Sequence, residues 1–93
     1  MARTYALRKK RERLIRRIAD HMDFLMGSIS TKSLRTPAFN LTMTVKGVTK
    51  SRYIPKDVLP LVRRLTKRHQ TLKTLLKELG DVNWLLVRQG EEL

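Results

Sequence analysis

The chain contains no cysteine. Disulfide bonds and thiolate metal sites are therefore excluded. No apolar run approaches the roughly 20 residues that a membrane span requires. The charged N-terminus is not followed by the apolar segment of a secretory signal. We therefore expect a cytoplasmic protein that does not act at a membrane.

Acidic residues are also scarce, because 8 Asp and Glu stand against 21 Lys and Arg and leave a formal net charge of +13. Charge of this size repels itself, and it predicts a polyanionic partner. Nucleic acid is that expected partner, with DNA favoured over RNA. At 93 residues the chain has room for a single domain with one thin core. We expect residues 1–13 to be a mobile basic arm and residues 90–93 a frayed tail.

The sequence shows no catalytic motif. It has no nucleophile and base at a recognisable spacing and no glycine-rich phosphate loop. His21 and His69 lack other ligand-type residues at metal-binding spacing, which favours structural or surface roles. The aromatic residues are too few and scattered for a platform on which bases stack. We expect no enzyme activity, no cofactor and no metal.

Residues 39–54 carry the pattern of a β-hairpin, which we take as the centre of the fold. A two-residue turn at Lys46-Gly47 would pair Val45 with Val48. The pairing would then continue residue by residue along the two strands. Type I′ geometry requires positive φ at both turn residues. The face expected to meet helices carries Phe39, Leu41, Met43, Val45, Val48 and Ile54. The opposite, hydroxyl-rich face carries Asn40, Thr42, Thr44, Thr49, Ser51 and Tyr53.

A basic helix is predicted before the hairpin, from Thr4 to Met26, with Gly27 ending it. Its apolar residues recur at heptad spacing, and Leu7 and Leu14 extend the stripe less regularly. The heptad positions are Ile15, Ile18, Met22, Leu25 and Ile29. A polar connector, residues 28–37, then leads into the hairpin. Pro37 restricts the residue before it to extended geometry.

A second basic helix is predicted after the hairpin, beginning near Asp57 as its cap, so that Pro60 falls in the first turn. Gly80 leaves open whether a short third helix follows, although the continuing heptad favours one long helix. The heptad seam is Leu61, Leu65, Leu72, Leu75, Leu79, Val82 and Leu86, with Arg68 as its one charged member. We therefore predict an α+β, mostly helical fold, in which two long basic helices pack antiparallel with one two-stranded β-hairpin between them.

The basic run of the first helix is the strongest functional signal, because its charges surround the helix with almost no acid among them. Lys and Arg in this arrangement neutralise phosphates, which positions a protein without reading base sequence. The hairpin and the second helix add further cations, and the alternative for each cluster is an ordinary solvated surface. The predicted nucleic-acid contacts are Arg8, Lys9, Lys10, Arg11, Arg13, Arg16, Arg17, Lys46, Lys50, Arg52, Arg63, Arg64, Lys67 and Arg68.

Several short motifs recur in a fixed order from Gly27 onward. They are Gly27-Ser28, Pro37-Ala38-Phe39, Lys46-Gly47, Tyr53-Ile54-Pro55-Lys56-Asp57, the leucine-rich run 72–79, and Asn83. This order resembles a family of small uncharacterised proteins encoded near transposases and other mobile elements. The resemblance implies a helix–hairpin–helix layout and a mobile-element or phage context. Many members carry a cysteine cluster before the hairpin, which this chain lacks, so no metal role is carried over.

The combined prediction is a small basic accessory protein that binds nucleic acid through its N-terminal helix and hairpin. Two alternatives stay open. One is a non-enzymatic adaptor or inhibitor, in which Trp84, Leu85 and Val87 anchor a partner protein or a second copy. The other is a ribonucleoprotein component such as a ribosomal protein.

Overall fold

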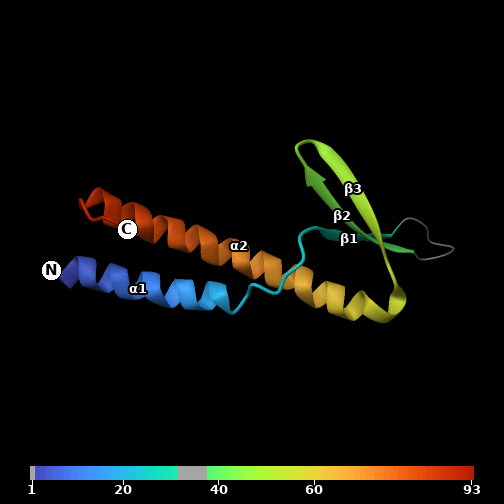
Figure 1. Cartoon of the computed structure of the whole chain (residues 1–93), viewed down its shortest axis with the longest axis horizontal. Helices are drawn as coiled ribbons and strands as arrows, with labels where there is room; N and C mark the ends of the chain where they lie inside the picture. The colour runs from blue at the N-terminus through green and yellow to red at the C-terminus, as the bar shows by residue number, and fades with distance from the viewer. Residues whose placement is uncertain (1, 32–37) are drawn as a thin grey trace. The chain divides into compact units, whose positions relative to one another are not determined.

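The computed structural model describes residues 2–31 and 38–93, and over these residues the fold is α+β and mostly helical, as predicted (Figure 1). The elements in chain order are α1 (Ala2–Ala19), β1 (Ser28–Thr31), β2 (Phe39–Val45), β3 (Val48–Ile54), the 3₁₀ turn η1 (Lys56–Val58) and α2 (Leu59–Arg88). The chain divides into two compact units. Unit 1 comprises the residues up to Met22 together with Gln70–Leu93, and unit 2 is Asp23–His69.

Unit 1 is a helical hairpin, in which α1 and the last turns of α2 lie side by side and run in opposite directions (Figure 1). Leu7, Leu14 and Ile18 recur at the spacing of one helix face. The buried core is Leu14, Leu75, Val82 and Leu86, with Leu7, Ile18 and Leu79 packed against it. Each leucine buried in this way stabilises the unit by roughly 1.5–3 kcal/mol.

The first helix is shorter than predicted, because α1 ends at Ala19 rather than Met26. His21 closes this end, since its backbone N–H donates to the carbonyl of Ile18 and its Nδ1 donates to the carbonyl of Arg17 at 2.6 Å. The predicted heptad is also wrong, because Ile15 and Met22 are exposed. The face that packs runs through Leu14, which the heptad pattern placed at the margin.

Unit 2 contains the predicted hairpin in the predicted register. Val45 pairs with Val48, and the pairing continues to Phe39 with Ile54. Lys46 has φ 51° and Gly47 has φ 78°, so both turn residues adopt the positive φ that a type I′ turn requires. The hairpin prediction is therefore confirmed pair by pair.

The sheet has three strands in the part of the chain that is described, so the predicted two-stranded arrangement is wrong. Ser28–Thr31, expected to begin a connector, forms β1 and pairs antiparallel with β2. Its only large apolar residue is Ile29, which is opposite Leu41, so the strand is too short to show an alternating pattern. Residues 32–37, including Pro37 and the geometry predicted before it, lie outside the described residues.

The apolar face of the hairpin is buried only at its base. Ile54 and Leu41 are buried there, whereas Val45 and Val48 near the turn are 46% and 56% exposed. A loop before β1 joins this region to α2, since the N–H of Leu25 donates to the carbonyl of Leu65 at 3.2 Å. The tip of the hairpin therefore projects into solvent.

The second helix begins and ends differently from the prediction, although its continuity is confirmed. Asp57 lies inside η1 rather than capping a helix, and α2 starts at Leu59 and passes through Gly80 without a break. At the other end Gly90 has φ 80°, its N–H donates to Val87, and the N–H of Glu91 donates to Leu86. This is a Schellman closure of the helix.

The predicted layout, in which two long helices pack antiparallel with a hairpin between them, is also wrong. α1 has 18 residues and α2 has 30, and only the part of α2 from Gln70 onward belongs with α1 in unit 1. The first turns of α2 belong to the sheet unit. Neither of the described helices is long and apolar enough to cross a membrane.

Candidate nucleic-acid interface

Two of the α1 cations are held by partners within unit 1. Arg8 Nη2 donates to Glu91 Oε2 at 3.0 Å and to the carbonyl of Glu92 at 2.7 Å. Arg11 Nε donates to Asn83 Oδ1 at 2.9 Å. These bonds attach α1 to the end of α2. Arg8 and Arg11 therefore have a structural role, which also limits their freedom to reach a phosphate.

A third cation, Lys9, has local partners only. Its Nζ lies 3.6 Å from Glu12 Oε2 and 5.5 Å from the centre of the Tyr5 ring. Both charged side chains are about half exposed. An exposed ion pair within a helix stabilises the protein by only about 0.3–0.5 kcal/mol. Lys9 can exchange these contacts for a phosphate at little cost.

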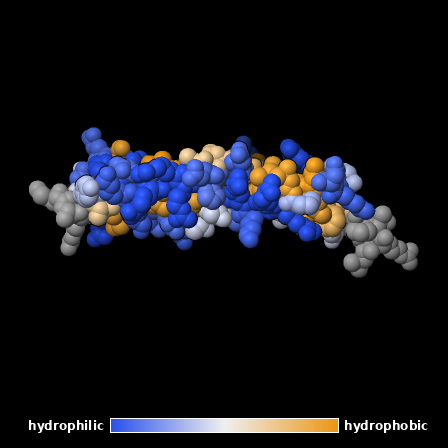
Figure 2. Space-filling model, turned by 90° about the horizontal axis from the view of Figure 1, so that it is seen from below, coloured by the Kyte–Doolittle hydropathy of each residue, from blue (hydrophilic) through white to orange (hydrophobic). Residues whose placement is uncertain are grey.

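Four more α1 cations point to solvent. Lys10, Arg13, Arg16 and Arg17 are exposed, and no side chain among the described residues bonds to them. Figure 2 shows hydrophilic atoms over most of the α1 surface in that view. Lys10, Arg13 and Arg17 follow one another at i, i+3 and i+7, so they share one face of the helix.

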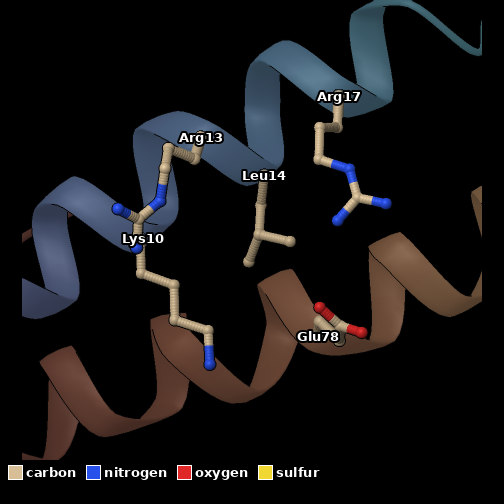
Figure 3. Close-up of a pocket in the computed structure, with 5 residues that line it drawn as sticks. All are labelled: Lys10, Arg13, Leu14, Arg17 and Glu78. Carbon is tan, nitrogen blue, oxygen red and sulfur yellow. The ribbon is translucent and has the colours of Figure 1, made fainter.

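These three cations surround an open cavity of about 210 Å³, which we call the cation pocket (Figure 3). Its lining is Lys10, Arg13, Leu14 and Arg17 from α1 and Glu78 from α2. Figure 3 shows Leu14 pointing from α1 toward α2, with Lys10 on one side of it and Arg17 on the other. Leu14 is buried in the core, so the cations are positioned by a packed residue of their own helix.

The charges of the cation pocket do not cancel. Three positive side chains and the carboxylate of Glu78 leave a formal charge of +2. Glu78 is not within ion-pair distance of any of them in the described structure. Two guanidinium groups and one ammonium group can hold a phosphate through charge-assisted hydrogen bonds. Because the pocket is open to solvent, such binding is sensitive to salt.

The second-helix cations belong to unit 2 and also divide into held and free groups. The Arg63 guanidinium lies 5.7 Å from the centre of the Phe39 ring, and Arg68 Nη1 donates to the carbonyl of Asp23 at 3.4 Å. Arg64 and Lys67 are exposed and have no such contact with the described residues. Unit 2 therefore offers its own set of free positive charges.

The hairpin cations are exposed. Lys46 occupies the turn, and Lys50 and Arg52 pair with Met43 and Leu41 on the face that carries the apolar residues. Their side chains extend out from this face into solvent. The structure thus gathers Lys10, Arg13 and Arg17 at one pocket and leaves the hairpin cations in unit 2.

The other face of the sheet carries bonded hydroxyl groups. Ser30 Oγ lies 3.0 Å from Thr42 Oγ1, which lies 3.3 Å from Ser51 Oγ, and a further pair joins Thr44 and Thr49 at 3.2 Å. Cross-strand bonds of this kind stabilise the sheet. The sequence predicted the hydroxyl-rich face of the hairpin but missed Ser30, which joins it through β1.

The two histidines have contacts that fit structural roles. His21 bonds to the end of α1, and the ring of His69 stacks on Phe24 with 5.3 Å between the ring centres. Within residues 2–31 and 38–93, no group of three His, Asp or Glu side chains is placed to hold a metal ion.

Sequence reasoning missed Glu78 as a neighbour of the α1 cations and Asn83 as the partner of Arg11. Glu78 lines the cation pocket, and Asn83 holds Arg11. No local pattern marks either residue, because each reaches α1 only through the register of the helical hairpin. Comparisons of the chain with protein-family models, with curated proteins and with solved structures find no match.

Proposed function

We propose that this protein binds nucleic acid, duplex DNA first, through phosphate contacts made by α1, as an accessory protein of a mobile element or phage. The observation that carries the proposal is the cation pocket, where Lys10, Arg13 and Arg17 gather against a single carboxylate. Arg16 adds a further exposed charge on the same helix. Cations with no acidic partner among the described residues are free to neutralise phosphates.

The length of this basic segment suits a DNA strand. At 1.5 Å of rise per residue, the axis from Lys10 to Arg17 spans about 10 Å. One strand of duplex DNA carries a phosphate for about every 3.4 Å of its axis, so the segment matches about three phosphates. Contacts of this kind release counterions and carry no direct information about base sequence.

The hairpin and the first turns of α2 supply the additional contacts of this proposal. Lys46, Lys50 and Arg52 are exposed on the hairpin, and Arg64 and Lys67 are exposed on α2. A β-ribbon with basic side chains can enter a groove of DNA. In this proposal α1 supplies most of the affinity, and unit 2 orients the protein.

The test is a binding titration by fluorescence anisotropy, with duplex DNA, single-stranded DNA and structured RNA, at about 50–200 mM salt. One variant combines Lys10→Gln, Arg13→Gln and Arg17→Gln. A matched control combines Lys73→Gln, Lys77→Gln and Arg88→Gln, which removes the same charge from exposed positions of α2. We expect the pocket variant to reduce the slope of log affinity against log salt by about 3, and the control to change it little.

Two outcomes would contradict the proposal. Equal losses in the two variants would mean that net charge alone matters and that the cation pocket is not the contact. Absence of binding to every nucleic acid at about 50 mM salt would remove nucleic acid as the partner. If the nuclease-treated chain then captures an acidic protein, the alternative function as an adaptor that binds a partner protein is favoured.

A further inference from the structure

The end of the hairpin that carries the turn is narrower than its base. β1 pairs with β2 from Phe39 to Thr42, so beyond Thr42 the sheet consists of β2 and β3 alone over the described residues. We call residues 43–50 the hairpin tip. Three residue steps lead from the pair of Met43 with Lys50 to the turn, or about 10 Å at 3.4 Å per residue. The hairpin tip is therefore a two-stranded ribbon about 10 Å long.

The hairpin tip presents apolar and positively charged side chains together. Val45 and Val48 form the last pair before the turn and are 46% and 56% exposed. Lys50 is two positions from Val48 and therefore on the same face, while Lys46 occupies the turn itself. Over the described residues, the side chains of both lysines form no hydrogen bond or ion pair. Methyl and ammonium groups are thus exposed side by side.

The opposite face of the hairpin tip is bonded within the sheet. Thr44 Oγ1 lies 3.2 Å from Thr49 Oγ1, so the two hydroxyl groups satisfy each other across the strands. The valine face has no such internal partner for its lysines. A ligand of the hairpin tip therefore gains more from the valine face than from the threonine face.

The charge of this region indicates which partner covers the valines. The chain has no acidic residue between Asp23 and Asp57. A region of this kind repels basic surfaces and attracts a polyanion. The partner must also offer apolar groups to the valines. Duplex DNA offers both, because the C5 methyl groups of thymine lie in its major groove and phosphates line the edges of that groove.

The dimensions of the hairpin tip favour the major groove over the minor groove. The major groove is about 12 Å wide and 8.5 Å deep, and it admits a two-stranded ribbon. The minor groove is only about 6 Å wide and exposes no methyl group. A ribbon about 10 Å long reaches the floor of the major groove when it enters with the turn first.

We infer that the hairpin tip recognises thymine in the major groove of duplex DNA. This inference rests on the proposed function and adds base recognition to its phosphate contacts. Val45 and Val48 pack on the C5 methyl groups of thymine. Lys46 donates to acceptor atoms on the neighbouring base edges, such as N7 and O6 of guanine. Lys50 and Arg52, which are further from the turn, donate to phosphates at the edge of the groove.

Deoxyuridine provides a direct probe, because it lacks the C5 methyl group of thymine and keeps the same base pairing. Anisotropy titrations compare a duplex of about 20 A·T pairs, two turns of DNA, with the same duplex in which deoxyuridine replaces every thymine. We expect the wild type to bind the second duplex more weakly, by about fourfold for each methyl group that it contacts. This comparison needs no variant of the protein.

Two double substitutions supply the test of the valines and its control. Val45→Ser with Val48→Ser removes the methyl groups and no charge, so this variant should bind the two duplexes equally and keep the salt dependence of the wild type. Thr44→Ser with Thr49→Ser removes methyl groups from the opposite face and keeps the bonded hydroxyls, so it should discriminate as the wild type does. Thermal unfolding checks that both variants remain folded.

Four results would overturn the inference, and they separate it from the proposed function. Equal affinity of the wild type for the two duplexes would exclude thymine recognition and leave the phosphate contacts standing. Discrimination that persists in the Val45 and Val48 variant would assign it to another surface. Binding to phosphatidylserine vesicles that requires the valines, without DNA discrimination, would assign the hairpin tip to a membrane surface. Absence of binding to either duplex at about 50 mM salt would remove duplex DNA as the partner in both proposals.

Discussion

Arg8 and Glu91 lie 83 positions apart in the chain and form an ion pair with 3.0 Å between Nη2 and Oε2. The same guanidinium group donates to the carbonyl of Glu92. The first turns of α1 are thus attached to the C-terminal residues, although the sequence predicts a mobile arm at one end and a frayed tail at the other. Whether these ends move in the absence of an anion stays a prediction.

The first prediction concerns the strength of this ion pair. A double-mutant cycle with Arg8→Gln and Glu91→Gln should give a coupling free energy of about 0.5–1 kcal/mol. The value is small because the two side chains are 41% and 35% exposed, so water and salt screen the pair. Urea denaturation of the four proteins measures the coupling. Lys73→Gln is the single-charge control, and no coupling at low salt would contradict an energetic role for the contact.

The second prediction compares two glycines. Gly27 has φ 125°, and a Cβ there would lie 2.8 Å from the carbonyl oxygen of Thr42. Gly27→Ala should therefore lower the free energy of unfolding by about 1–3 kcal/mol. Gly80 lies in α2 with open space around it, so Gly80→Ala should raise that free energy by about 1 kcal/mol.

Thermal unfolding of dilute protein, followed by circular dichroism, checks both glycine variants. The wild type measured at the same concentration is the reference, since concentration also affects any dimer. If Gly27→Ala is as stable as the wild type, then the close approach of its backbone to β2 does not constrain this position.

The third prediction tests whether the start of α2, in unit 2, contributes to DNA binding. Arg64→Gln with Lys67→Gln removes two exposed charges from the start of α2, and it should lower the slope of log affinity against log salt by about 2. Arg63→Gln with Arg68→Gln removes equal charge from side chains that contact Phe39 and the Asp23 carbonyl, so a smaller change in slope is expected. Anisotropy titrations measure both. An unchanged slope in the Arg64 and Lys67 variant would exclude the start of α2 from the contact and leave the hairpin cations as the contribution of unit 2.

The hairpin was predictable in detail because its information is local. Alternating polarity fixes which residues share a face, and Gly47 marks the turn, so the register from Val45 with Val48 to Phe39 with Ile54 follows. β1 was not predictable, since four residues with one large apolar side chain show no period. β1 forms because its backbone pairs antiparallel with the edge of β2 that does not face β3.

The helices were predictable in kind but not in the face they bury. Both Leu14 and Ile15 are apolar, and periodicity alone placed the neighbouring Ile15 in the seam. Leu14 is buried and Ile15 is exposed, because the partner surface on α2 selects between them. The same partner provides Asn83 and Glu91, which convert Arg11 and Arg8 from free charges into structural contacts.

The amino-acid sequence by itself determined the excess of positive charge, the long helix through Gly80 and the turn at Lys46-Gly47, because each depends on residues close together in the chain. Only the tertiary structure decided which cations remain free and which side chains line the cation pocket. Those outcomes depend on the antiparallel register of α1 against the end of α2, which joins residues that are more than 60 positions apart.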